Sequence, residues 1–163
     1  MKAVLYLDVD GVLWDIQPRL KDNPKAVVGS DPTTFACAAN GLDEFLEYVL
    51  EKFEVRWCTT WAMSGTMRHG EMDNLCGHTG VPVETWAKVQ PSLGWYDYKS
   101  ENINWNEYHG GREFAWIEDD LLEEEIHTLE RNGCIDNYFH TDVFEDSDAL
   151  IKTLAKLKER FGK

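Results

Sequence analysis

The sequence predicts an α/β fold: one Rossmann-like domain with a mostly parallel central sheet of about five strands flanked by helices. Two patterns lead to this prediction. Short apolar runs alternate with longer segments whose apolar residues recur at helical spacing. The strand-like runs also lack clean apolar–polar alternation, which is typical of strands buried on both faces of a sheet. A chain of 163 residues has the length of one domain, and we assign residues 1–163 to it.

The first predicted element is a strand at residues 2–8, an apolar run that stops at Asp8. Residues 14–40 contain three prolines and scattered polar residues. We therefore expect an irregular excursion or flap there, with a short hairpin around residues 26–28. A loop of this length in a compact domain usually serves a function.

The next three predicted elements are a helix, a strand and a helix. Asn40 is a suitable N-cap for an amphipathic helix over residues 42–53. A strand is predicted at residues 55–58, directly before two threonines. The second helix is expected over residues 63–76 and would end at Gly77.

The second half of the sequence predicts three more strands. They are expected at residues 81–86, 114–117 and 137–141. Pro82 weakens the first of them. A helix between the last two closes at Gly133, and a final amphipathic helix is expected over residues 147–161.

The composition argues against several classes of protein. Lys and Arg number 16 and Asp and Glu number 30, so the net charge is −14, which disfavours nucleic acid as a general partner. No apolar run is long enough to span a membrane, and acidic residues come too early for a signal peptide. Four cysteines without CxxC spacing favour reduced thiols and a cytoplasmic location.

Polar clusters follow three of the predicted strands. They are Asp8–Asp10, Thr59–Thr60 and Glu118–Asp120. Ligands of parallel sheets bind beyond the carboxyl ends of the strands, so these clusters predict a site at one edge of the sheet. Two carboxylates that face one crevice repel each other unless a cation lies between them. With a third acid from the last cluster, they predict a Mg²⁺ site.

The first cluster also carries a family resemblance. Residues 7–13 read LDVDGVL and match the DxDG(V/T) signature of the haloacid dehalogenase superfamily of phosphatases. A strand ending at Thr59, a downstream lysine and a strand ending in paired acids resemble the other motifs of that family, in the same order. The resemblance covers residues 2–142.

The resemblance implies a role for each matching residue. Asp8 resembles the nucleophile that forms an aspartyl-phosphate, and Asp10 resembles the general acid/base. Thr59 would bind a phosphoryl oxygen, and Lys99 would screen the charge of the phosphate and the nucleophile. Mg²⁺ would be held by the Asp8 side chain, the Asp10 backbone carbonyl and Asp119.

Three assignments have alternatives. Asp120 replaces Asp119 as the metal ligand if the preceding strand is one residue longer. Lys88 is the alternative to Lys99, and Thr60 replaces its neighbour as a phosphate ligand if the strand phase slips by one residue.

The short spacing between motifs predicts a capless or minimally capped member of this family, because Thr59 follows Asp10 by only 49 positions. An open site favours large or extended phosphorylated substrates, or closure by a partner chain. Trp14, Arg19 and Lys21 are candidate substrate contacts, although packing or solvation is the simpler interpretation. The other tryptophans mostly fall on predicted strands and are interpreted as core residues.

The leading hypothesis is a Mg²⁺-dependent phosphomonoester hydrolase. Its partner would be a phosphorylated small molecule or an exposed phosphate on a larger molecule. The alternative within enzymes is a nucleotidase or a nucleic-acid end phosphatase. The alternatives from other classes are a phospho-accepting signalling module and a non-catalytic metal-binding scaffold.

Overall fold

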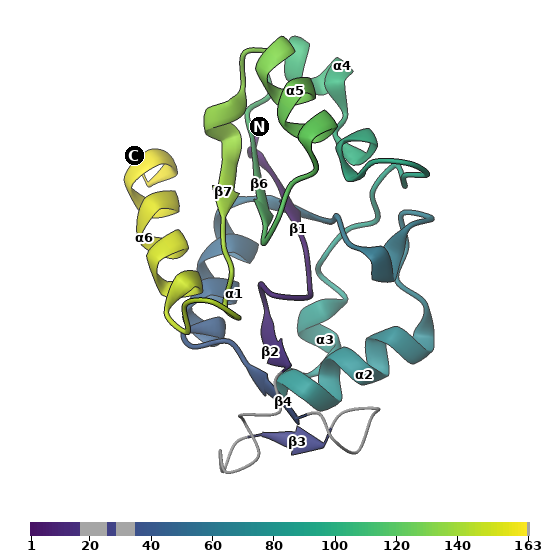
Figure 1. The fold of residues 1–163 in the computed structure, drawn as a ribbon, viewed down its shortest axis with the longest axis vertical. Coiled ribbons are helices and arrows are strands. Elements are labelled where there is room, and N and C mark those ends of the chain that lie inside the picture. Colours follow the sequence, from purple (N-terminus) through teal and green to yellow (C-terminus); the bar gives the residue numbers. More distant parts are fainter. Residues whose placement is uncertain (17–25, 29–34, 163) are drawn as a thin grey trace.

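The computed structural model describes residues 1–16, 26–28 and 35–162. Its main sheet confirms the predicted α/β fold with parallel strands (Figure 1). In the described residues this sheet has four strands, in the order β5-β1-β6-β7, and every neighbouring pair is parallel. The strands are β1 (Val4–Leu7), β5 (Glu54–Trp57), β6 (Phe114–Glu118) and β7 (Tyr138–His140). The expectation of about five strands was therefore one too many.

The missing strand is the one predicted at residues 81–86. This segment holds a short helix, α3 (Val83–Trp86), with Pro82 as its N-cap at φ −68°. Proline lacks a backbone N–H and its fixed φ suits a helix start, so it favours the helix over a sheet ladder. After this helix, Gln90 forms an isolated bridge with Arg56 of β5, and its backbone N–H donates to the Val55 carbonyl at 2.7 Å.

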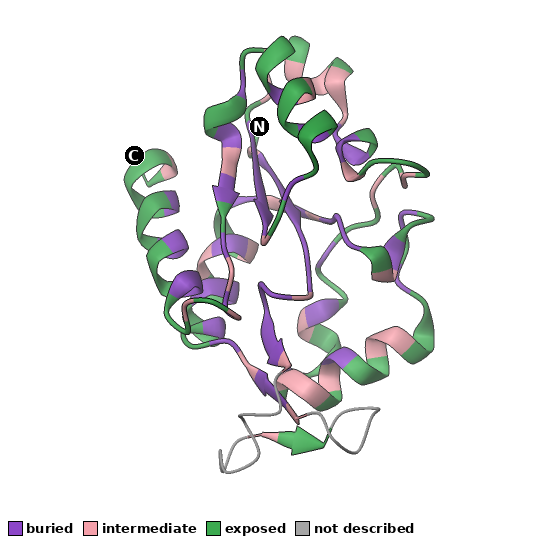
Figure 2. Cartoon of the chain, in the orientation of Figure 1, coloured by how far each residue is buried: buried purple, intermediate pink, exposed green. Residues whose placement is uncertain are grey.

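Helices cover both faces of the main sheet (Figure 1). The longer ones are α1 (Leu42–Lys52), α2 (His69–Thr79), α5 (Glu123–Arg131) and α6 (Ala149–Phe161), and α4 (Trp105–His109) is short. Alternate residues of β1 enter separate cores: Leu5 and Leu7 belong to one, Val4 and Tyr6 to the other. The two central strands, β1 and β6, are accordingly buried on both sides (Figure 2).

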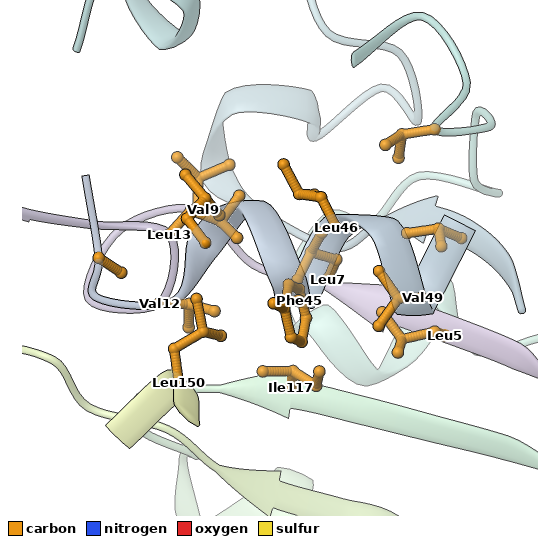
Figure 3. Close-up of a cluster of buried hydrophobic side chains, with 14 of the residues drawn as sticks. Leu5, Leu7, Val9, Val12, Leu13, Phe45, Leu46, Val49, Ile117 and Leu150 are labelled. Carbon is orange, nitrogen blue, oxygen red and sulfur yellow. The ribbon is translucent and has the colours of Figure 1, made fainter. Parts of the chain in front are cut away.

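The larger core joins the sheet to α1 and α6. Leu5 and Leu7 of β1 pack with Phe45 of α1, Ile117 of β6 and Leu150 of α6 (Figure 3). Burying large aliphatic and aromatic side chains stabilises a domain by about 1.5–3 kcal/mol each. This packing fixes the carboxyl ends of β1 and β6, where the predicted site lies.

The predicted N-cap of α1 and both predicted ends of α2 were wrong. The residue preceding α1 is Gly41, with φ 77°, whereas the Asn40 side chain donates to Asp148 at 3.2 Å. Residues 63–68 form turns, and α2 begins only at His69. Gly77 lies inside α2, which ends at Gly80 with φ 70°. The left-handed conformation of Gly80 stops the helix, as is common at helix C-termini.

The segment after β1 is more regular than predicted. Its described residues form a small antiparallel sheet of β2 (Trp14–Ile16), β3 (Val27–Val28) and β4 (Phe35–Ala38), in the order β2-β4-β3. It lies beyond the carboxyl end of β1 (Figure 1). The predicted substrate contacts Arg19 and Lys21 lie outside the described residues.

The remaining described elements are three short 3₁₀ helices: η2 (Thr60–Ala62), η3 (Lys99–Asn102) and η4 (Ile135–Asn137). The final helix, α6, begins at Ala149, two residues after the predicted start. Among the described residues, no helix combines the length and the apolar character that a membrane span requires.

Candidate active site

Three strands of the main sheet end at the same level. Leu7 of β1 pairs with Trp57 of β5 and with Ile117 of β6. The Asp8 backbone N–H donates to the Ile117 carbonyl at 3.1 Å, and the Cys58 N–H donates to the Leu7 carbonyl at 2.8 Å. The residues that follow these strands therefore share one edge, as the sequence predicted.

Three acidic side chains meet at this edge. Asp8, Glu118 and Asp119 each offer a carboxylate oxygen, and these atoms lie within 4.8 Å of one another. Asp8 and Glu118 are buried, at 2% and 1% exposure, and Asp119 is half-buried. Three carboxylates in this spacing form a donor set that suits a hard divalent cation such as Mg²⁺.

Lys99 joins this acidic group from η3. Its Nζ lies 2.7 Å from Glu118 Oε2 and 3.3 Å from Asp8 Oδ1. The alternative lysine, Lys88, is exposed after α3. The structure thus brings Lys99, and not Lys88, to the acids.

The charges of this group are unbalanced. Burial raises the pKa of Asp8, against the attraction of Lys99. Burial also raises the pKa of Glu118, and the nearby Asp8 carboxylate raises it further. Burial alone would lower the pKa of Lys99, but Asp8 and Glu118 together hold it above its usual value. Three carboxyl groups face one ammonium, so an added cation would find a favourable field here.

Asp119 is placed by the turn that follows β1. Gly11 has φ +70°, and a Cβ at this position would lie 2.5 Å from Asp119 Oδ2. Glycine alone allows both this conformation and this close approach. Although β6 includes Glu118 and is one residue longer than predicted, Asp119 still joins the acidic group, and Asp120 is exposed.

Thr59 lies beside the acids at the end of β5. Its side chain is fully buried, and its hydrogen bond with Asp8 acts to lower the pKa of that acid. Thr59 also caps η2 by accepting a hydrogen bond from the Trp61 backbone N–H at 3.4 Å. The alternative, Thr60, is exposed.

Hydrogen bonds to backbone carbonyls join the segments that carry Thr59 and Lys99. The Trp95 N–H donates to the Met63 carbonyl at 2.8 Å, and the Trp95 indole donates to the Thr59 carbonyl at 3.4 Å. On the other side, the Cys58 thiol donates to the Lys99 carbonyl at 3.6 Å. The two segments are therefore tied together at several points.

The Asp10 carboxylate lies outside the acidic group. Its two oxygens accept hydrogen bonds from the indoles of Trp14 and Trp61, both at 2.8 Å. Sequence reasoning interpreted most tryptophans as core residues and missed these contacts. A partial signal existed in the four-residue spacing of Asp10 and Trp14, but Trp61 is distant in sequence. The role of the Asp10 backbone carbonyl as a metal ligand stays a prediction.

A scan against protein-family models finds no match to this sequence, and a search of curated proteins finds none either.

Proposed function

We propose that this protein is a Mg²⁺-dependent phosphomonoester hydrolase that works through an aspartyl-phosphate on Asp8. The observation that carries the proposal is the buried contact of Asp8 with Lys99 at the carboxyl edge of the sheet. A carboxylate oxygen of Asp8 also lies within 4.8 Å of carboxylate oxygens of Glu118 and Asp119. Buried titratable groups of opposed charge at such an edge are typical of active sites. The DxDG sequence at residues 8–11 supports the same assignment.

Asp8 would form the covalent bond. Its carboxylate oxygen attacks phosphorus, the ester P–O bond breaks, and the leaving oxygen takes a proton from the Asp10 carboxyl group. Water then attacks phosphorus and gives its proton to Asp10, and the Asp8–phosphorus bond breaks to release phosphate. After the second step, Asp8 is again a free carboxylate and Asp10 again carries its proton.

Lys99 and Thr59 would bind the phosphoryl group. The ammonium of Lys99 already lies beside Asp8, and its positive charge offsets the repulsion between an anionic nucleophile and an anionic phosphate. The buried hydroxyl of Thr59 donates a hydrogen bond without the cost of ordering a mobile side chain. Glu118 holds Lys99 in place through the 2.7 Å contact.

The acids fit a divalent ion. Asp8, Asp119 and the Asp10 carbonyl would hold Mg²⁺, which when bound neutralises phosphate charge. Glu118 would contribute mainly through Lys99, because one of its oxygens is engaged by that ammonium. The substrate class is a phosphate monoester, on a small molecule or exposed on a larger one, and the expected location is cytoplasmic.

The test uses a generic aryl ester, 4-nitrophenyl phosphate, with Mg²⁺. We expect turnover that is lost with EDTA and falls at least about 1,000-fold in Asp8→Asn, since the amide is a poor nucleophile. Asp120→Asn, which changes an exposed neighbouring acid, serves as the matched control and should keep wild-type activity. Retained activity in Asp8→Asn would contradict the proposal. A long-lived phosphoryl adduct without turnover would instead indicate a phospho-accepting signalling module.

A further inference from the structure

Two indoles from different parts of the fold hold the Asp10 carboxylate. Trp14 Nε1 donates to Asp10 Oδ1 and Trp61 Nε1 donates to Oδ2, each at 2.8 Å. Each carboxylate oxygen therefore has its own donor. Two hydrogen bonds from separate donors to opposite oxygens fix both the direction and the rotation of the carboxyl group.

The two donors are themselves fixed. Trp14 is fully buried in β2, where it pairs with Ala38 of β4, and the His78 ring lies 4.5 Å from its ring. Trp61 lies in η2, and its ring meets that of Trp14 edge-on at 4.9 Å. Neither indole can turn away from Asp10 without disturbing the other.

Burial of an indole in this protein does not by itself require an acceptor. The Nε1 atoms of Trp86 and Trp116 are also buried, and within the described ranges they have no hydrogen-bond partner. The convergence of two indoles on one carboxylate is therefore more than the satisfaction of buried N–H groups. It concerns Asp10, the acid of the first motif whose carboxylate lies outside the acidic group.

We propose that Trp14 and Trp61 are positioning residues that hold the Asp10 carboxylate in one orientation for proton transfer at the leaving oxygen. The proposal rests on the proposed function, in which Asp10 gives that proton. Proton transfer requires a fixed heavy-atom geometry, and a freely rotating carboxylate spends little time in it. Each carboxylate oxygen keeps a second lone pair, so the two indoles leave room for the proton that Asp10 carries.

The kinetic test compares two esters of similar shape, phenyl phosphate and 4-nitrophenyl phosphate. Phenolate is the poorer leaving group and needs the proton more. We expect Trp61→Phe, which keeps an aromatic ring but removes the N–H, to lower kcat/KM, which reports the step that releases the leaving group, about tenfold for phenyl phosphate and less than about threefold for 4-nitrophenyl phosphate. Asp10→Asn should show the same bias more strongly. Trp86→Phe is the matched control, because it removes an indole N–H that has no partner among the described residues.

The outcomes separate this proposal from the proposed function. The positioning role alone is overturned by one set of results. In that set the wild type turns over both esters and Asp10→Asn discriminates between them, but Trp61→Phe loses activity equally on both. Absence of Mg²⁺-dependent turnover in the wild type would overturn both. Trp14→Phe should repeat the bias, and its unfolding temperature must be measured because Trp14 is fully buried.

A second measurement needs no activity. The sequence has seven tryptophans, so a ¹⁵N–¹H spectrum contains only seven indole N–H signals to assign. Trp14→Phe and Trp61→Phe assign two of them, and Asp10→Ala should move these two upfield, because loss of the hydrogen-bond acceptor shields the indole proton. Unmoved signals in a folded Asp10→Ala protein would also overturn the proposal.

Discussion

The main sheet carries a cluster of charged side chains at each end, and the two clusters differ in balance. At the carboxyl end, Asp8, Glu118 and Asp119 face a single base, Lys99. At the amino end, two glutamates face two arginines: Glu54, Glu107, Arg56 and Arg112. The amino-end cluster is complete without any further ion, whereas the carboxyl-end cluster has more acid than base.

The amino-end cluster forms a closed ring of ion pairs. Arg56 contacts Glu54 at 2.6 Å and Glu107 at 3.1 Å. Arg112 contacts the same two glutamates at 2.7 and 3.0 Å. Each carboxylate and each guanidinium has two partners, so the four charges balance one another in a network, and networks contribute more to stability than isolated surface ion pairs do. The comparison teaches that an excess of buried acid distinguishes the carboxyl end from the amino end, and the proposed Mg²⁺ site rests on this excess.

The largest expected effect comes from removing Lys99, the one cationic side chain that the described residues bring to the carboxyl-end cluster. Lys99→Met should abolish turnover and lower the free energy of unfolding in EDTA by about 3 kcal/mol, because it leaves buried acids without a counter-charge. Mg²⁺ should restore part of that stability by supplying positive charge. Urea denaturation with and without Mg²⁺ measures both effects.

The matched control is Lys88→Met, at the exposed lysine after α3, and it should change neither property. An unfolding free energy for Lys99→Met equal to that of the wild type in EDTA would show that the acids do not depend on this lysine.

An intermediate effect is expected at the amino end. Arg112→Met removes two ion pairs at a side chain that is 12% exposed. Since the glutamate partners remain accessible to water, the free energy of unfolding should fall by about 1–2 kcal/mol. kcat and the stabilisation by Mg²⁺ should stay unchanged. Arg68→Met, at an exposed ion pair with Glu71, should have almost no effect, and a kcat loss in Arg112→Met would show that the two ends are coupled.

The smallest effect concerns pH. A hydrogen bond from Arg112 is the main cause that lowers the pKa of Glu54. A depressed pKa stabilises the fold above the pKa of the unfolded chain, about 4.3, and that contribution is lost as pH falls through the folded value. Glu54→Gln should therefore be less stable than the wild type at neutral pH, with a difference that shrinks below about pH 4.3. A difference that stays constant with pH, or that also occurs in the exposed Glu47→Gln control, would contradict this assignment.

The parts of the site that sequence could predict are the local ones. An apolar run followed by acids marks a buried strand and its end, which is how Asp8 and Asp119 were found. The periodicity that predicted α1 and α6 reflects faces that pack on the sheet. The spacing of about one helix and one loop before β6 favoured Lys99 over Lys88, and Lys99 is the lysine that contacts the acids.

The predictions that were wrong, and the contacts that were missed, depend on residues distant in sequence. Residues 81–86 have strand-like composition, and the helix there follows from Pro82 and from the burial of Trp86 in the larger core. The indoles on Asp10 come from β2 and η2, and no spacing in the chain brings Trp61 to Asp10. The small sheet after β1 likewise requires pairing between strands separated by an irregular segment.

The links between the segments that carry Thr59 and Lys99 have a consequence for recognition. The Trp95 contacts and the Cys58 thiol hydrogen bond join these two segments. The Thr59 hydroxyl and the Lys99 ammonium are therefore held at a constant distance from each other. Under the proposed function, this constant distance would select a tetrahedral oxyanion of one size, whatever group it is attached to. Discrimination between substrates would then depend on the surroundings of the leaving group, where Asp10 and its two indoles lie.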